Sequence, residues 1–241
     1  MRVVSLVPSS TETLLAWGVD VVACTRFCEQ PAMRHVGGTK DPDVAAIVAL
    51  APDLVVMDRE ENRREDAEAL AAARVRVHVT HVTSLADVTP TLVALARATG
   101  VASAADMVRA ASAYDVAADA VPVAGGDGCR VAVLIWRRPW MALGAATYGS
   151  SVLRHLGLHN VLLPADGAYP EAELAVLAER RPDLVVLPSE PYPFAERHVR
   201  EVTEGVPGAA VVLVDGRDLF WWGVRTPAAL DRLSGALQRS R

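Results

Sequence analysis

One repeated segment constrains the fold of this chain more than any other feature. Residues 44–57 read VAAIVALAPDLVVM, and residues 174–187 read LAVLAERRPDLVVL. Each is an apolar helical stretch that leads into Pro-Asp-Leu-Val-Val, a short strand, and each is followed by a polar loop that carries a glutamate, Glu60 or Glu190. Apolar strands that alternate with helices are typical of parallel sheets covered on both faces. Two matched segments in the same order predict two similar α/β lobes.

The rest of the chain continues this alternation. Residues 3–7 and 131–135 are apolar strands, and each is followed by a turn and a helix that ends at glycine. The sheets should therefore be mainly parallel, with right-handed crossovers. We expect further strands near residues 19–24, 54–57, 75–79, 160–163, 184–187 and 211–214. Helices are expected near residues 11–17, 43–50, 62–73, 89–100, 149–156, 171–179, 195–203 and 227–239.

A long helix is predicted between the two lobes, over Ser103–Val121. Ser103 and Asp106 have the spacing of a capping box, and apolar residues follow at three- and four-residue intervals. Pro122 and a glycine-rich run then end the helix. The predicted organisation is an N-terminal lobe at residues 1–88, linking helices at 89–122 and a C-terminal lobe at 123–241.

Charge and composition exclude several classes of protein. The net charge is −5 and Lys40 is the single lysine, so the chain lacks the basic stripe of a nucleic-acid-binding protein. No apolar run is long enough to cross a membrane, and Met1-Arg2 leads at once into the first strand. We therefore expect no membrane insertion and a cytoplasmic location. A periplasmic or extracytoplasmic protein whose signal had been removed would have the same sequence.

Aromatic residues mark the predicted ligand site. In parallel sheets, ligands bind beyond the carboxyl ends of the strands, and the loops at those ends form one cleft if the two lobes face each other. Aromatic side chains in loops offer flat, partly hydrated surfaces to a large planar ligand, although they also serve to pack loops or lobes together. The second-lobe loops are expected to contain Trp136, Trp140, Tyr148, Tyr192, Phe194, Phe220, Trp221 and Trp222.

Polar candidates lie mainly in the first lobe. The loop Asp58–Arg63 follows a buried strand, and it either binds a cationic or amide-rich ligand or forms a solvated helix start capped by Asn62. Ser9 or Ser10 is expected to cap the helix over 11–17. The cysteines and histidines lack the spacing of a metal site, and no catalytic motif is present, so we predict neither metal ligands nor catalytic residues.

These segments resemble a known family. RVVSLVPSSTETLLAWG, FCEQP, GGTKDPDVAAIVALAPDLVV and EENRREDAEAL resemble the first lobe of the helical-backbone substrate-binding proteins, and IWRRPWMALG, RRPDLVVLPSEPYPF and VDGRDLFWWG are similar to the second. The family includes cobalamin-binding and siderophore-binding components of ABC importers. The resemblance implies two Rossmann-like lobes joined by one rigid helix, with the ligand between them. It also implies aromatic residues that frame a corrin and an acidic residue on each lobe that docks onto the permease.

The resulting hypothesis is a binding protein, not an enzyme, for a corrinoid or a comparable chelate such as a ferric siderophore. It has no intrinsic cofactor, and its partners would be a small-molecule ligand and an ABC permease. Two alternatives stay open: a cytoplasmic enzyme or accessory protein that acts on such a cofactor, and a ligand-free regulatory module. The candidate ligand-binding residues are Ser9, Arg26, Asp58, Glu60, Asn62, Trp136, Arg137, Trp140, Tyr148, Glu190, Tyr192, Phe220, Trp221 and Trp222.

Overall fold

The computed structural model describes residues 1–101 and 128–238, which form two compact units. The first unit contains the described residues 1–82, 86–101 and 222–225, and the second contains 83–85, 128–221 and 226–238. The helix expected over Ser103–Val121 lies outside the described residues. The lobe boundaries expected at residues 88 and 122 stay predictions.

The first unit is built on a four-stranded parallel sheet. Its strand order is β2-β1-β3-β4, with Val3 opposite Leu54 and Val55 opposite Val77. β1 and β3 lie at the centre, which is why β3 is buried along its whole length. The strands are β1 (Arg2–Ser5), β2 (Asp20–Cys24), β3 (Leu54–Asp58) and β4 (Val77–Thr80).

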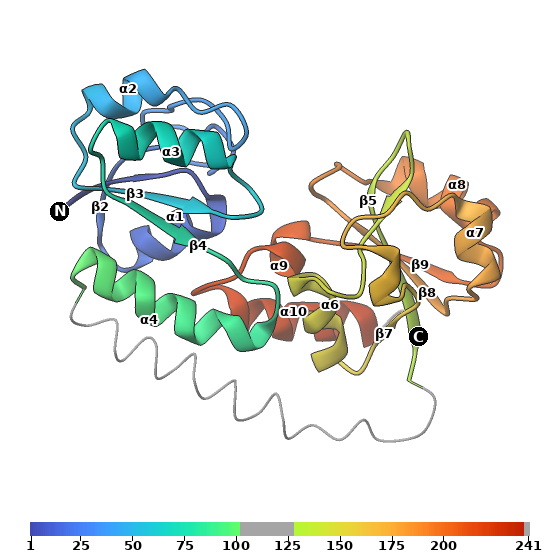
Figure 1. Ribbon diagram of the computed structural model, residues 1–241. Coiled ribbons are helices and arrows are strands. Elements are labelled where there is room, and N and C mark those ends of the chain that lie inside the picture. Colours follow the sequence, from blue (N-terminus) through green and yellow to red (C-terminus); the bar gives the residue numbers. More distant parts are fainter. Residues whose placement is uncertain (102–127, 239–241) are drawn as a thin grey trace. The chain divides into compact units, whose positions relative to one another are not determined.

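Helices cover both faces of this sheet. One face carries α2 and α3, and the other carries α1 and α4 (Figure 1). Strand side chains alternate between the two faces, so Val4 and Val55 pack with Ile47 of α2 and Leu70 of α3, and all four are fully buried. The helices are α1 (Pro8–Ala16), α2 (Val44–Ala49), α3 (Arg64–Ala72) and α4 (Val88–Thr99), the last preceded by the short η1 (Leu85–Asp87).

The second unit repeats this plan with one change. Its main strand order is β6-β5-β8-β9, β7 pairs with the start of β5, and β6 is antiparallel to the end of β5. The other pairs are parallel, which confirms the expected mainly parallel α/β class. The strands are β5 (Arg130–Trp136), β6 (Met141–Ala142), β7 (His159–Asn160), β8 (Leu184–Pro188) and β9 (Ala210–Val214).

The helices of the second unit also form two layers. α7 and α8 lie on one face of the sheet, and α6, α9 and α10 lie on the other (Figure 1). Leu134 and Val185 of the strands pack with Leu177 of α7 and Val202 of α8 in one buried cluster. The helices are α6 (Tyr148–His155), η2 (Pro164–Asp166), α7 (Leu174–Glu179), α8 (Glu196–Gly205), α9 (Gly216–Phe220) and α10 (Thr226–Gln238).

Several expected element boundaries are wrong for identifiable reasons. α1 begins at Pro8, because proline is well suited to the first position of a helix, and Ser9 and Ser10 therefore lie within the first turn instead of capping it. α3 begins at Arg64, so Asn62 is not its N-cap. The strand expected at 160–163 is only two residues long, since the chain turns into η2, where Asp166 accepts a hydrogen bond from the Leu163 amide at 2.7 Å.

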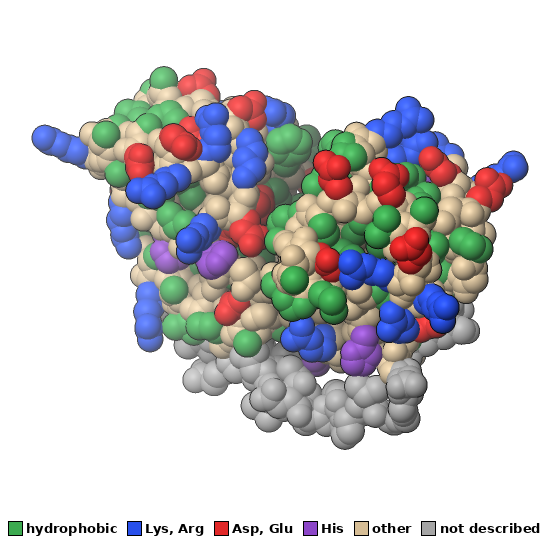
Figure 2. Space-filling model, turned by 45° about the vertical axis from the view of Figure 1, so that its right-hand side comes forward, with side chains coloured by type: hydrophobic (Ala, Val, Ile, Leu, Met, Phe, Trp, Pro, Cys, Tyr) green, Lys and Arg blue, Asp and Glu red, His purple; other side chains and the backbone are tan. Residues whose placement is uncertain are grey.

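The surface charges are mixed in sign. Figure 2 shows arginine and lysine side chains interspersed with aspartate and glutamate on the face in view, without a continuous basic stripe there. Within residues 1–101 and 128–238, no helix has the length and apolar character needed to cross a bilayer.

Candidate functional site

Each unit has a point at which its strand connections change direction. The chain leaves β1 towards β2 on one side, and β3 lies on the other side of β1. In the second unit, β7 and β8 likewise pair with opposite edges of β5. In open α/β sheets, the carboxyl ends of the strands at such a switch point are the usual place for ligands. The residues after β1, β3, β5 and β8 are therefore the first to consider.

An aromatic site, defined here as Trp136, Trp140, Tyr192, Phe194 and His198, occupies the switch point of the second unit. Trp136 ends β5, and Tyr192 follows β8. Their ring centroids are 5.6 Å apart in an edge-to-face arrangement, and the Tyr192 and Phe194 centroids are 4.7 Å apart. Trp136 is 43 % exposed, whereas Phe194 is 4 % exposed. The site thus presents an exposed indole supported by rings that packing holds in place.

Arg137 borders the aromatic site and is already engaged. Its guanidinium forms two hydrogen bonds with the Glu201 carboxylate, at 2.9 and 3.0 Å, and lies 5.7 Å from the Trp140 ring centroid. The hydrogen bonds that Arg137 donates to Glu201 raise the pKa of Arg137, with a smaller contribution from the Tyr192 hydroxyl. Arg137 therefore places a neutralised ion pair, not a free cation, beside the aromatic rings.

His198 is a buried member of the aromatic site, and its hydrogen bonds fix the position of the proton on its neutral ring. Its Nδ1 accepts a hydrogen bond from the Ala195 amide at 3.0 Å, so the proton of the neutral ring is on Nε2. Nε2 is 3.5 Å from the Tyr192 hydroxyl. Burial lowers the pKa of His198, and the nearby positive charges of Arg197 and Arg137 lower it further. The imidazole is 5 % exposed and contacts both Tyr192 and Phe194 edge-on.

Other expected aromatic residues are not on loops or are buried. Tyr148 is the first residue of α6, where Thr147 caps the helix, and its hydroxyl is 3.1 Å from that of Thr226. Phe220 ends α9 and is half-buried. Trp221 and Trp222 are 9 % and 4 % exposed. The expectation that the whole set lies on loops is therefore wrong for Trp136, Tyr148 and Phe220, because β5 ends one residue later and α6 begins one residue earlier than expected, and α9 was not expected.

Glu190 lies between β8 and Tyr192 and is half-buried. Its backbone passes so close to Gly216 that a side chain there would meet the Glu190 nitrogen and oxygen at 2.7 Å. The Gly216 amide donates to the Ser189 hydroxyl at 3.0 Å. The start of α9 thus holds the loop that leads to Tyr192.

A polar site, defined here as Ser9, Asp58, Glu60 and Asn62, occupies the switch point of the first unit. Asn62 accepts from the Asp58 amide at 2.7 Å and donates to the Leu6 carbonyl at 3.2 Å, so it joins the chain beyond β1 to the chain beyond β3. Asp58 is buried and accepts from the Thr80 hydroxyl at 2.8 Å. Both side chains therefore hold the loop in shape, and Glu60 is the exposed acid of the site.

Ser9 and Arg26 differ in exposure. Ser9 is 2 % exposed, and its hydroxyl, like that of Ser10, is buried and unpaired within the described part of the chain. Arg26 is largely exposed and pairs with Asp41 at 2.9 Å. The ligand-binding roles of all the candidate residues stay predictions.

Two features of these sites were not anticipated from the sequence. One is the pairing of His198 with Tyr192. The sequence gives one indication of where His198 lies: it stands three residues after Ala195, the residue that precedes α8, which is the spacing of a capping box. The other is the attachment of Trp222–Arg225 to α1, where Arg225 binds Glu12 through two hydrogen bonds at 2.6 and 2.7 Å. Glu12 and Arg225 are far apart in sequence, so no local pattern predicts that they pair.

Cys24 and Cys28 are buried, Cys129 is half-buried, and none of the three forms a disulfide. Hydrogen bonds from Cys24, Thr11 and Thr25 lower the pKa of Cys28 to about 6, against the opposing effect of burial. No group of three or more potential metal-binding side chains occurs in the described ranges.

Each of the two mainly parallel α/β units carries candidate residues at the carboxyl ends of its strands. Residues 3–199 match the family described as periplasmic binding protein, so the chain belongs to that family. The family consists of binding proteins and not enzymes, which confirms the non-enzymatic expectation. It gives no support to a cytoplasmic location.

Individual relatives agree with this assignment. The vitamin B12-binding protein of Salmonella typhimurium is 24 % identical over 190 residues, which are 77 % of this chain and 71 % of the relative. The periplasmic vitamin B12 binding protein of Vibrio cholerae has a TM-score of 0.80 at 18 % identity and covers 99 % and 97 % of the two chains. A periplasmic heme-binding protein from Roseiflexus has a TM-score of 0.83 at 20 % identity, with 99 % and 98 % covered. These likenesses confirm the resemblance stated from the sequence.

Proposed function

We propose that this protein binds a corrinoid or a related planar metal chelate without modifying it. The observation that carries the proposal is the aromatic site: an indole that is 43 % exposed, at a switch point, with Tyr192 and Phe194 behind it. Exposed aromatic rings that cluster with others often line a surface that a ligand covers. A planar macrocycle covers such a ring with little loss of conformational entropy on either side.

The polar site supports the same ligand class. Glu60 is exposed on a loop whose shape Asn62 and Asp58 fix through their hydrogen bonds. A corrin ring has amide side chains at its edge, and a carboxylate is an acceptor for their N–H groups. We propose Glu60 as an acceptor for the amide groups of a ligand.

A ferric porphyrin is the second candidate, and one observation favours it. The Tyr192 hydroxyl has the Arg137 guanidinium and the Nε2–H of His198 as neighbours, and both are hydrogen-bond donors. These donors fix the position of the Tyr192 oxygen, and a tyrosine oxygen is a hard ligand of the kind that Fe(III) takes in some heme proteins. Relatives of this chain include a vitamin B12-binding protein and heme-binding proteins, so both candidate ligands occur in the family.

Direct titration distinguishes the two candidates. Cyanocobalamin, hemin and a ferric hydroxamate siderophore are each added to the full chain while tryptophan fluorescence and ligand absorbance are recorded. The correct class should quench emission saturably, and Trp136→Ala should weaken its binding by about 1–3 kcal/mol. Tyr192→Phe should shift the absorbance of bound hemin if Tyr192 ligates iron, and leave cyanocobalamin spectra unchanged.

Trp17 provides the matched control, since it is 8 % exposed and lies at the end of α1, away from either switch point. Trp17→Phe should retain the parent affinity for every ligand. If none of the three ligands binds at tens of micromolar, the ligand class is wrong, and the ligand-free regulatory alternative gains support.

We further propose that the protein delivers its ligand to an ABC permease outside the cytoplasm. Membership of the periplasmic binding protein family is the support for both statements. Fractionation of the native cell, with N-terminal sequencing of the recovered protein, tests the location. Recovery in the cytosolic fraction would contradict the proposal and favour an accessory role.

A further inference from the structure

Cys24 and Cys28 form a buried pair of thiols that the proposed function leaves unused. Cys24 is the last residue of β2, and Cys28 ends the turn that follows, in which the Cys28 amide donates to the Thr25 carbonyl at 3.2 Å. The turn brings the two side chains together, and the Cys24 thiol donates a hydrogen bond to the Cys28 sulfur. Cys24 is 0 % exposed and Cys28 is 3 % exposed. Two thiols in contact are therefore enclosed at the carboxyl end of β2.

The two cysteines differ in how firmly the backbone holds them. The Cys24 amide donates to the Arg34 carbonyl at 3.0 Å, and the Cys24 carbonyl accepts from the Val36 amide at 2.9 Å. Cys28 lies on a surface turn instead, since its neighbour Phe27 is 51 % exposed. A small movement of this turn therefore changes the distance between the two sulfur atoms, while β2 stays in place.

Hydroxyl groups lie next to the Cys28 sulfur. The Thr11 hydroxyl, from α1, and the Thr25 hydroxyl are each 3.2 Å from it. The hydrogen bonds from Cys24 and from these threonines lower the pKa of Cys28 to about 6, and the contact with Cys28 raises the pKa of Cys24. The thiolate is the form of cysteine that attacks a disulfide. Cys28 is therefore the attacking residue of the pair, and Cys24 is the second to react.

A disulfide suits this enclosed place better than a bound metal ion. A soft metal ion held by both sulfur atoms would require two thiolates, and so would leave net charge away from water. Within the described part of the chain, these thiols belong to no group of three or more potential metal-binding side chains. A disulfide carries no charge and needs only the two sulfur atoms that are already in contact.

We propose that Cys24 and Cys28 are a modification site, which a thiol–disulfide oxidant closes to a disulfide. The Cys28 thiolate attacks one sulfur of the oxidant, whose S–S bond breaks as the first thiolate leaves. Cys24 gives its proton to that thiolate and attacks the Cys28 sulfur, which expels the second thiolate. The two cysteines together lose two electrons and two protons, and the oxidant gains both and becomes two thiols. The inference goes beyond the proposed ligand, and it rests on the proposed location only for the supply of oxidant.

The closed disulfide ties the surface turn to the end of β2. Arg26 and Phe27 lie within the closed loop, where the Arg26 guanidinium is 4.9 Å from the Phe27 ring centroid. The bond therefore fixes two exposed side chains at the carboxyl edge of the first sheet. A disulfide also restricts the unfolded chain, although a loop this short limits the effect. The oxidised protein should melt about 4–8 °C above the reduced protein.

Tryptic mapping of the full chain tests the bond directly. The protein is incubated with oxidised glutathione near pH 7, remaining thiols are alkylated, and the denatured chain is digested. Trypsin cleaves after Arg26, which lies between the two cysteines, so the reduced chain gives separate peptides 3–26 and 27–34. In the oxidised chain the joined peptides should exceed the separate ones about tenfold until dithiothreitol parts them. Two alkylated peptides, or two peptides that each carry glutathione, would overturn the proposal.

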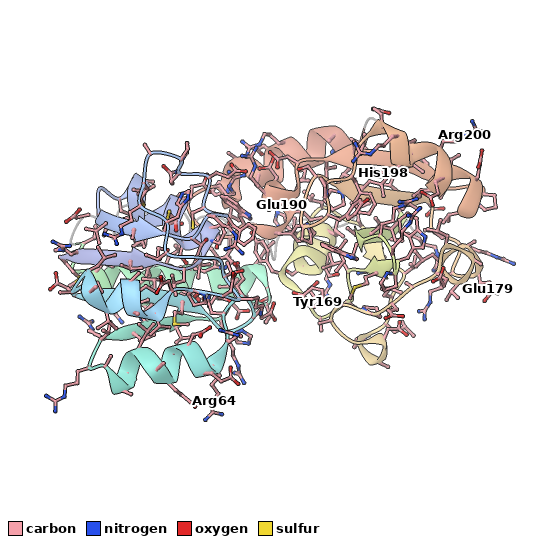
Figure 3. All side chains as sticks on the ribbon, turned by 90° about the horizontal axis from the view of Figure 1, so that it is seen from above. Arg64, Tyr169, Glu179, Glu190, His198 and Arg200 are labelled. Carbon is pink, nitrogen blue, oxygen red and sulfur yellow. The ribbon has the colours of Figure 1, made fainter. Side chains whose placement is uncertain are left out.

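An exposed pair with the same four-residue spacing provides the matched control. The side chains of Arg64 and Glu68 are 88 % and 61 % exposed on α3, and Arg64 points outward from this helix (Figure 3). Arg64→Cys with Glu68→Cys, combined with Cys24→Ser and Cys28→Ser, places two Cβ atoms about 5–6 Å apart, farther than an unstrained disulfide allows. This variant should gain glutathione at both sites. Closure equal to that of the parent would show that spacing alone forms the bond, and would refute the role assigned to the buried contact.

Single variants test which cysteine attacks first, with Cys129→Ser as the common background. In Cys24→Ser, which keeps a hydroxyl donor beside Cys28, a mixed disulfide with glutathione should form on Cys28 and persist. Cys28→Ser should react at Cys24 about tenfold more slowly or less. A faster reaction of Cys28→Ser would contradict the assignment of Cys28 as the attacking residue. None of these measurements uses a ligand, so their outcome is independent of whether a corrinoid or a porphyrin binds.

Discussion

The ion pair between Glu12 and Arg225 should hold the segment Trp222–Arg225 on the first unit. The segment lies between α9 and α10 in sequence but packs on α1, where the Val224 amide meets the Thr13 hydroxyl at 3.4 Å. The Arg225 guanidinium and the Glu12 carboxylate form two hydrogen bonds at 2.6 and 2.7 Å. We propose a double-mutant cycle with Glu12→Gln and Arg225→Gln.

The magnitude follows from burial. The side chains of Arg225 and Glu12 are 13 % and 33 % exposed, so the pair is neither on the open surface nor fully buried. Exposed pairs contribute about 0.2–1 kcal/mol, and removing one partner of a buried pair costs about 3–5 kcal/mol. We expect each single variant to lose about 2 kcal/mol of unfolding free energy, with a coupling energy of about 1–2 kcal/mol.

Urea denaturation followed by circular dichroism measures the four unfolding free energies. The pair Arg64–Glu68 supplies the control, because its side chains are 88 % and 61 % exposed and its coupling should be below about 0.5 kcal/mol. The charge-swapped double variant Glu12→Arg with Arg225→Glu should recover part of the lost stability. A coupling as small as that of the control would refute the claim that this ion pair anchors the segment.

Three further changes have defined outcomes. Trp17→Ala should lower the free energy of unfolding, measured by urea denaturation, by about 3 kcal/mol or more, because it leaves a cavity at a buried position. It should leave ligand affinity unchanged. Unfolding free energy equal to that of the parent would show that Trp17 is not part of the core. Gly223→Ala should lower the melting temperature, since φ is 123° and the new Cβ would meet the Thr13 hydroxyl; a rise would contradict this. Burial lowers the pKa of His78, His155 and His198, so these rings favour the fold when neutral. Stability should be complete above about pH 6.5 and should fall as acid protonates the unfolded chain, and a urea midpoint higher at pH 5 than at pH 7.5 would contradict that sign.

Local sequence was sufficient to predict the class of fold. The Pro-Asp-Leu-Val-Val segments form β3 and β8, the central strands that follow α2 and α7. A short run of β-branched apolar residues bounded by turn residues is typical of a buried parallel strand. Gly100 ends α4 in the left-handed conformation, φ 69°, as its position after the last apolar turn predicted. These signals depend on neighbours within a few residues.

Polar side chains near helix starts were predicted less well. Ser9 and Asn62 are residue types that often serve as N-caps. However, α1 begins at Pro8, before Ser9, and the Asn62 side chain donates a hydrogen bond to the Leu6 carbonyl instead of capping α3. The reason is that hydrogen-bond partners distant in sequence compete with the local cap, and the sequence does not reveal which partner lies closer.

The sequence by itself therefore determined two parallel α/β lobes and the kind of residue that ends each strand, because periodicity and turn chemistry are local. Only the tertiary structure decided that Trp136 is exposed while Trp221 and Trp222 are buried, and that His198 lies beneath Tyr192. The difference is physical: the energy of an aromatic or ionisable side chain is set by the neighbours that pack around it. In this chain those neighbours come from separate strands and helices whose meeting is a property of the folded sheet.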